Sequence, residues 1–216
     1  MRNRGSFQLV TGPQQEPVNA SDFAVHHLKV DFLDDAGFIA DQLAAAREYL
    51  EGQYETCFIT QTWKYVLDFF PGAQVSPWYS SWLWPIQSWI EIPKAPMQSV
   101  TSITYIDPNG NPQTMPSANY VQDMVRTPPR IGLASGQAWP ATNLQVINSV
   151  TILGNYGYGD TPGQVPARAR QAIRLVAAHF YENREENVIA QRIRPLELPL
   201  GARRMMDTLD WRSKVA

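Results

Sequence analysis

The stretch that decides the fold is residues 155–185, which read NYGYGDTPGQVPARARQAIRLVAAHFYENRE. It opens with glycines and prolines that favour turns, and Pro166 stands where the first residue of a helix would be. Behind Pro166 apolar residues recur at steps of three and four, while Arg170, Arg174 and Arg184 fall outside that stripe. The stripe consists of Ala169, Ala172, Ile173, Val176, Ala177 and Phe180. The pattern predicts a strand over residues 148–156 that leads into an amphipathic helix with one buried face.

Two further helices are predicted near the N-terminus. Asn19 or Ser21 can cap a short helix that runs to about Leu28. Asp34 or Asp35 can cap a longer helix to Tyr54, whose apolar face carries Ala36, Ile39, Leu43, Ala46 and Leu50. Residues 1–18 are polar and rich in turn residues, so we expect an extended N-terminal arm that is mobile unless a partner holds it.

The middle of the chain changes from helical spacing to alternation. Segments rich in β-branched and aromatic residues, each bounded by Pro, Gly or Asn, predict strands over residues 58–70, 88–92, 100–106, 119–125 and 148–156. Residues 107–111, DPNGN, predict a hairpin turn because Asn-Gly accepts positive φ. We therefore predict an α+β fold, in which a helical bundle of N- and C-terminal helices (residues 19–57 and 160–199) encloses a β-rich central insertion (residues 58–159). A C-terminal helix and tail (residues 200–216) follow.

Composition limits the possible functions. The chain has 216 residues, of which 44% are hydrophobic, and a formal net charge of −2. A core of ordinary size is therefore possible, and the basic excess that tight binding to many phosphates requires is missing. Cys57 is the single cysteine and cannot form an internal disulfide, and no apolar segment follows Arg2 and Arg4. We expect a protein that is made and used in the cytoplasm.

The residues that could support chemistry do not form a catalytic set. Asp107, Asn109 and Asn111 resemble the start of a calcium loop, but Pro112 stands where that loop needs glycine. His26 and His27 near Asp31, Asp34 and Asp35 could form a metal or acid–base cluster, yet adjacent histidines on a helix point apart and the aspartates suit caps. His179 lacks the second histidine of a zinc-protease motif. We predict no catalytic residue, no metal site and no cofactor.

One segment stands out by its tryptophans. Residues 69–90 contain no charged side chain, and Trp78, Tyr79, Trp82, Trp84 and Trp89 crowd together there. Pro71, Pro77 and Pro85 together with many polar residues exclude a membrane span. The tryptophans either pack on the sheet, form a tip that docks on a protein, or form a platform for a sugar.

The tail is a second candidate for an interface. A short helix from about residue 200 to 211 would carry large apolar and basic side chains, namely Arg203, Arg204, Met205, Met206, Leu209, Trp211 and Arg212. Methionine and tryptophan adapt to a groove and arginine pairs with an acidic rim, which predicts docking on another chain. The alternative is a helix that folds back on its own core.

The order of short motifs along the chain resembles the head-tail connector family of tailed bacteriophages. These motifs are Leu9-Val10, Glu16-Pro17-Val18, residues 27–31 (HLKVD), 39–49, 59–63 (ITQTW), 92–93, 97–105 (MQSVTSITY), Asp107, Gly110, 129–131 (PRI), Trp139-Pro140 and the run from Gly157 to Glu185. The resemblance covers residues 9–185, and the tryptophan-rich segment at about residues 72–87 looks like an enlarged family loop.

The resemblance implies a structural virion protein and not an enzyme. Members of the connector family form a ring, most often of twelve copies, below the portal protein. This ring extends the DNA channel and receives the next neck, tail-terminator or tail protein. DNA would pass through the ring without sequence-specific binding. The portal would then be the leading candidate for the chain on which the tail helix docks. Assembly would take place in the bacterial host cytoplasm, and the protein would remain in the virion neck. Two alternatives stay open: a carbohydrate- or protein-binding module that uses the tryptophans, and a hydrolase that uses His27 and Asp31.

Overall fold

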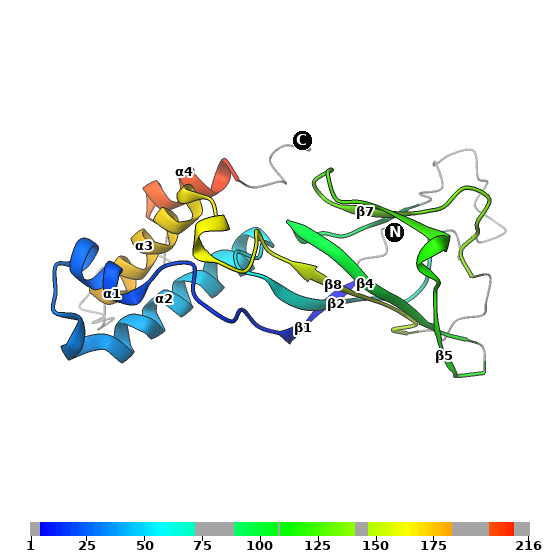
Figure 1. The fold of residues 1–216 in the computed structure, drawn as a ribbon, viewed down its shortest axis with the longest axis horizontal. Coiled ribbons are helices and arrows are strands. Elements are labelled where there is room, and N and C mark those ends of the chain that lie inside the picture. The colour runs from blue at the N-terminus through cyan, green and yellow to red at the C-terminus, as the bar shows by residue number, and fades with distance from the viewer. Residues whose placement is uncertain (1–4, 72–88, 108, 141–146, 183–198, 210–216) are drawn as a thin grey trace, which may run out of the picture. The chain divides into compact units, whose positions relative to one another are not determined.

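The computed structural model describes residues 5–71, 89–107, 109–140, 147–182 and 199–209. The chain divides into two compact units, which are described separately. The β unit comprises Met1–Gly12 and Thr60–Gly157, and the helical unit comprises Pro13–Ile59 and Tyr158–Ala216. The structure thus has a mixed α+β fold with antiparallel sheets, which confirms the α+β class but not the predicted arrangement of a helical bundle around a β-rich insertion (Figure 1).

The helical unit is built on two long helices that pack against each other. Its elements are α1 (Ala20–Asp22), the π-helical turn η1 (Phe23–Leu28), α2 (Phe32–Tyr54), the 3-10 turn η3 (Pro162–Gln164), α3 (Ala167–Glu182) and α4 (Leu200–Asp207). The predicted α3 stripe is confirmed, since Ile173 and its apolar neighbours are buried in one core with Leu43 and Leu50 of α2. Alanines at several of these contacts let the two helices approach closely.

The starts of the N-terminal helices are only partly as predicted. The Asn19 cap is confirmed, because its Oδ1 atom accepts hydrogen bonds from the backbone N–H groups of Ser21 (2.9 Å) and Asp22 (3.1 Å). The helix α2 begins at Phe32, before the predicted caps, and Asp35 interrupts it with non-helical dihedral angles (φ −124°, ψ 20°). The Asp35 carboxylate accepts a hydrogen bond of 2.7 Å from the Tyr181 hydroxyl of α3.

The described residues of the β unit form a five-stranded sheet and a three-stranded sheet. The larger has the order β1 (Ser6–Thr11), β2 (Gln61–Leu67), β8 (Val150–Tyr156), β4 (Met97–Ile106) and β5 (Pro112–Thr114). The smaller, called here the small sheet, has the order β3 (Trp89–Glu91), β7 (Arg130–Leu133) and β6 (Tyr120–Asp123), and the 3-10 turn η2 (Ser117–Asn119) precedes β6. All strand pairs are antiparallel.

Strand β8 holds the centre of the larger sheet. Its residues alternate between buried and partly exposed, as the sequence pattern predicted. Gly154 lets β8 lie close to β4, because a Cβ atom there would come within 2.9 Å of the Ser99 carbonyl oxygen. The predicted strands are present but mostly shorter: the strand expected over residues 58–70 spans Gln61–Leu67 only.

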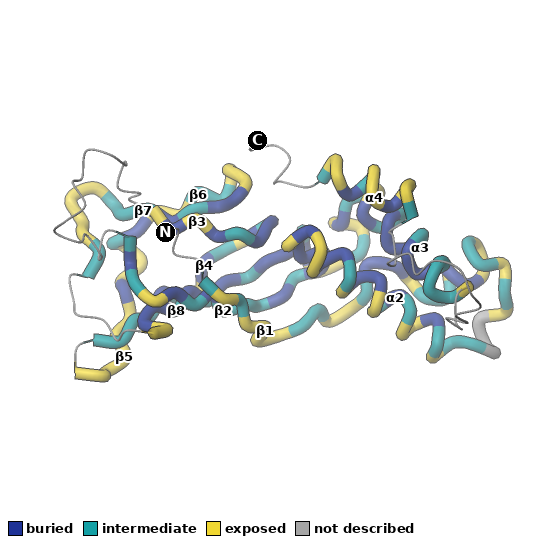
Figure 2. Tube along the Cα trace, turned by 180° about the vertical axis from the view of Figure 1, so that it is seen from behind, coloured by how far each residue is buried: buried dark blue, intermediate teal, exposed yellow. Residues whose placement is uncertain are grey.

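The N-terminal segment corrects one expectation. Residues 6–11 are extended, but they are not a mobile arm, because they pair with β2 in the register Phe7 to Tyr65. The Phe7 ring stacks on the Tyr65 ring at 4.6 Å, and the Lys94 ammonium lies 5.3 Å from the Phe7 ring centre. Phe7 therefore anchors β1, while most other β1 residues are exposed at the edge of the sheet (Figure 2).

The predicted turn at residues 107–111 is confirmed, although its second strand is β5 and not the segment at 119–125. The Asp107 Oδ1 atom accepts hydrogen bonds from the N–H groups of Asn109 (2.9 Å) and Asn111 (2.8 Å), and Gly110 has a φ of 84°. The strands β1, β5 and β7 were not predicted. Within the described residues, no helix is both long and apolar enough to cross a membrane.

Candidate assembly surfaces

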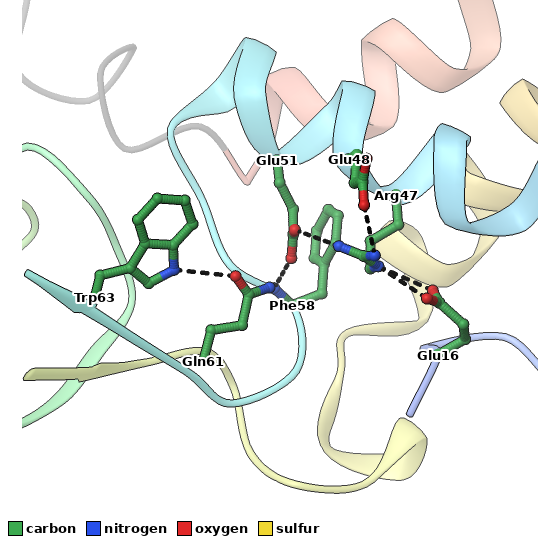
Figure 3. A network of polar contacts seen from close by, with 7 residues as sticks. All are labelled: Glu16, Arg47, Glu48, Glu51, Phe58, Gln61 and Trp63. Carbon is green, nitrogen blue, oxygen red and sulfur yellow. Dashed lines mark hydrogen bonds and ion pairs between the residues drawn. The ribbon is translucent and has the colours of Figure 1, made fainter. Parts of the chain in front are cut away.

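A buried cluster of charges ties three segments of the helical unit together. The Arg47 guanidinium on α2 lies 2.9 Å from Glu51 Oε2 and 2.9 Å from Glu16 Oε2 (Figure 3). The other Glu51 oxygen accepts a hydrogen bond of 2.8 Å from the backbone N–H of Phe58. The side chains of Arg47 and Glu51 are only 7% and 10% exposed. The cluster therefore fixes residue 16 and the chain after α2 to the same point of that helix.

The electrostatics of this cluster fit a structural role. Burial by itself would lower the pKa of Arg47, but the charges of Glu51 and Glu16 and their hydrogen bonds outweigh burial, so the pKa lies above its ordinary value. The guanidinium stays charged, and both carboxylates are engaged in ion pairs. A general acid or base must exchange protons near neutral pH, and the Arg47 guanidinium does not.

Three of the polar residues considered in the sequence, His27, Cys57 and Asp107, have surroundings that fit a structural role. The His27 ring stacks on Phe23 at 5.2 Å, and burial, reinforced by the Arg174 charge and opposed by Glu182, lowers its pKa. Cys57 is buried. The hydrogen bonds of the hairpin turn lower the pKa of Asp107, most strongly the one from the Asn111 backbone. Among the described residues, no group of three His, Cys, Asp or Glu side chains could hold a metal ion.

The tail helix α4 differs from the expectation that its apolar side chains face a partner. Met206 is 1% exposed and packs in the core of the helical unit, and Met205 and Leu209 lie against the same core. The Tyr54 hydroxyl donates a hydrogen bond of 3.2 Å to Asp207 Oδ1. The alternative of a helix folded back on its own core therefore describes residues 200–209, and Met206 is not available to a partner. Arg203 and Arg204 remain exposed.

The other predicted interface residues lie outside the described parts of the chain. They are Trp78, Tyr79, Trp82 and Trp84 of the tryptophan-rich segment and Trp211 and Arg212 of the tail.

Two further exposed surfaces lie in the β unit, and of their residues only Trp89 belonged to the tryptophan cluster that the sequence offered as a docking tip. The first is the outer face of the small sheet, where Trp89 is 38% and Val121 57% exposed. Arg130 lies on this face with its guanidinium 5.3 Å from the Trp89 ring centre and 2.8 Å from the Asp123 carboxylate. The second is strand β1, where Leu9 and Val10 are each 48% exposed. Alternation within residues 88–92 and 119–125 was visible in the sequence, but the pairing that gathers these side chains was not.

Comparisons with solved structures identify chains of the same fold. A chain from the virion of a native gene transfer agent particle superposes with a TM-score of 0.65 at 20% identity, covering 92% of this chain and 94% of that one. A chain from the neck of an empty gene transfer agent particle, computed with C6 symmetry, gives 0.61 at 22% identity. A chain from the neck of the native particle, computed with C12 symmetry, gives 0.57 at 23% identity. Each neck match covers 93% of this chain and 94% of the other.

No protein-family model and no curated protein matches the sequence. The structural matches confirm the expected resemblance to neck proteins of phage-like particles at the level of the fold.

Proposed function

We propose that this chain is a structural virion protein, a head-tail connector that forms a ring under the portal protein. The observation that carries the proposal is the similarity, over more than nine tenths of both chains, to chains in the necks of gene transfer agent particles with C6 and C12 symmetry. In this proposal the ring has twelve copies, extends the DNA channel and receives the next neck, tail-terminator or tail protein. The helical unit is its core, residues 60–157 are inserted into that core, and strand β1 joins them from the N-terminal side to complete the β unit.

The chemistry of the described residues supports a structural role. The buried carboxylates of Glu16 and Glu51 pair with Arg47, and the Asp107 carboxylate holds a turn. These groups stabilise the chain and leave no positioned nucleophile and base among them. The net charge of −2 suits a channel that DNA passes without strong binding to phosphates. We expect the chain to assemble in the bacterial host cytoplasm and to remain in the virion neck.

Electron microscopy of particles tests this proposal. Particles made with and without the gene for this chain are compared, and the purified full-length chain is imaged alone and after mixing with the portal protein of the same particle. We expect a ring of density directly below the portal in complete particles, and filled heads without tails when the chain is missing. Complete tailed particles without the chain, or complete particles in which mass spectrometry finds no copy of it, would refute the proposal.

An enzymatic function is tested by substrate screens. Hydrolysis of esters, phosphates, glycosides and peptides by the purified chain should not exceed background. Turnover that a single substitution at His27 or Asp31 abolishes would revive the hydrolase alternative.

A further inference from the structure

Gly132 lies in the middle of the small sheet, and no described residue of its own chain requires a glycine at this position. It lies in β7, the central strand, where glycine weakens a strand because it has no side chain to pack. Its φ is outside the left-handed region, and no described atom lies within 4 Å of the position that a Cβ atom would take. Gly154, by contrast, is required by the nearby Ser99 carbonyl oxygen. A glycine within a strand often marks a bulge, a bend, or a place where a ligand or another backbone approaches closely, and β7 pairs with β3 and β6 without a register shift at Gly132.

The residues beside Gly132 make this position apolar. The register places Trp89 and Val121 directly opposite Gly132 on the two flanking strands, so the three residues share one face of the sheet. Ile90 and Ile131 lie on the other face and are buried. With respect to the described residues, the outer face therefore presents an open position between an exposed indole and an exposed valine.

The next row of this face is charged. Glu91, Arg130 and Asp123 are aligned across the three strands, and Arg130 forms an ion pair of 2.8 Å with Asp123. An apolar centre with a polar rim is the anatomy of a protein interface.

The β unit carries a second exposed apolar surface that matches this one. Among the described strand residues, exposed large hydrophobic side chains occur on the small sheet, at Trp89 and Val121, and on β1, at Leu9 and Val10. Val10 is the extra residue of a β-bulge, since Leu9 pairs with Trp63 and Thr11 with Thr62. Strand β1 (SFQLVT) carries no charge and lies at the edge of the larger sheet.

The two surfaces lie on opposite sides of the β unit. The order of the larger sheet puts β2 and β8 between β1 and β4, and the small sheet joins β4 through a hydrogen bond of 3.2 Å from the Val100 N–H to the Gln122 side chain. Both views of the fold show this separation (Figure 1, Figure 2). Two different patches on opposite sides are what a head-to-tail contact in a ring requires.

We propose that the outer face of the small sheet, centred on Gly132, receives the β1 edge of a second copy of this chain, and that this contact repeats around the ring. The proposal rests on the proposed function and names the surfaces that hold neighbouring copies together. Leu9 and Val10 of one copy lie between Trp89 and Val121 of the next, where only glycine leaves room for the incoming strand.

Filling the open position tests the proposal. Gly132→Val adds a strand-favouring side chain that meets no described atom, so the purified variant should keep or raise its melting temperature. In particles, we expect at least a tenfold loss of ring occupancy by cryo-EM. Normal occupancy would overturn the proposal, and so would a variant that no longer folds, because the face would then be covered by its own chain.

A charge substitution with a matched control provides a second test. Val121→Glu places a carboxylate on the proposed contact, whereas Val125→Glu makes the same change four residues away, outside the strand, at a side chain that is 97% exposed. We expect Val121→Glu to abolish the ring and Val125→Glu to leave it intact. Equal effects of the two variants would overturn the proposal.

Crosslinking in assembled particles identifies the pairing directly. The double variant Leu9→Cys/Val121→Cys adds two exposed thiols to a chain whose single cysteine is buried. A disulfide within one copy would leave a species of monomer mass, so only a contact between copies can give larger species. Oxidation should give a ladder of multiples of the 24.4 kDa chain, and each single variant should give no ladder.

These outcomes separate the two proposals. A wild-type ring in the neck together with no ladder and normal Gly132→Val particles would overturn the contact and leave the connector function standing. A wild-type chain that never enters the neck would overturn both.

Discussion

Replacing Arg47 by methionine should destabilise the helical unit and leave the stability of the β unit unchanged. The substitution keeps a long, helix-compatible side chain and removes the charge that faces Glu51 and Glu16. Glu51 would keep its hydrogen bond from the Phe58 N–H but would lose the charge of Arg47, although its side chain is only 10% exposed. Truncating one partner of a buried ion pair costs about 3–5 kcal/mol.

The structure favours the lower end of that range. Glu16 is 32% exposed and can regain water, so its lost ion pair adds at most about 1 kcal/mol. A loss of about 3 kcal/mol with a urea slope of about 2 kcal/mol/M lowers the unfolding midpoint by about 1.5 M. Against a total stability of about 5–15 kcal/mol, the variant should still fold.

Two spectroscopic probes assign the effect to one unit. Six of the seven tryptophans, at positions 63, 78, 82, 84, 89 and 139, lie between residues 60 and 157, so tryptophan fluorescence reports mainly on the β unit. The long helices α2 and α3 belong to the helical unit, so circular dichroism at 222 nm reports on that unit. The shift should appear in the circular dichroism transition.

Two further variants make the reasoning refutable. In Arg47→Met/Glu51→Gln, the amide oxygen can still accept from Phe58 without a buried charge, so most of the lost stability should return. Glu48→Gln removes a carboxylate that contacts the same guanidinium at 3.2 Å but is 69% exposed, and should change stability by less than about 0.5 kcal/mol. An unchanged midpoint for Arg47→Met, or no recovery in the double variant, would refute the account.

Three other changes test the helical core, its tail and its histidine. Ile173→Asp places a carboxylate at a fully buried position, so it should lower the free energy of unfolding by more than about 4 kcal/mol and give insoluble protein. The control Ile173→Val should lower it by about 1 kcal/mol. Equal melting temperatures of the two variants would contradict the buried apolar stripe of α3. Deleting residues 200–216 should lower the melting temperature of the helical unit, because the loss of Met206 creates a cavity in its core. An unchanged melting temperature would favour a tail that contributes only to partner binding. The pKa of His27 is lowered in the fold, so its contribution to stability is present above its unfolded pKa of about 6.5 and is lost as pH falls below that value. His27→Gln should flatten this pH dependence of the urea midpoint between pH 8 and 5.5, and an unaltered profile would show that His27 is not its source.

The helices could be predicted because their signal is local and repeated. Each turn of α3 contributes an apolar residue to the same stripe, and each polar residue such as Arg174 confirms the face by falling outside it. The Asn19 cap is likewise a local event, since its acceptor and donors lie within three residues.

The missed strands depend on distant partners. Phe7 lies in a short, uncharged segment next to turn residues, and its stacking partner Tyr65 is far away in the sequence. Likewise, the Gly5 N–H is bonded to the Tyr65 hydroxyl 60 positions along the chain. Strands β5 and β7 have three and four residues, and Gly132 lowers the strand signal of β7 further. Alternation in one segment cannot show which segment it pairs with.

The Arg47 cluster shows the same limit at the level of side chains. The spacing of Arg47 and Glu51 on one helix face is readable as a pair four residues apart. The sequence does not show that this pair is buried, or that Glu16 joins it from 31 positions away. Both facts follow from the packing of the N-terminal segment on α2. The same carboxylates on a solvent-exposed helix would contribute little to stability.

The tail helix shows why an amphipathic pattern alone does not identify a partner. Met206 and Arg203 belong to one short helix, and the sequence assigned both to an interface because apolar and basic residues suit docking. Burial separates them, since Met206 is enclosed by the chain's own core while Arg203 and Arg204 face outward. An apolar helix face has one occupant at a time, so a partner that used Met206 would first have to displace the chain's own core, including α3, from it. Contacts of α4 that leave the fold intact must therefore use its exposed side chains, such as Arg203 and Arg204. The small sheet, in contrast, has an apolar face that the described residues leave uncovered.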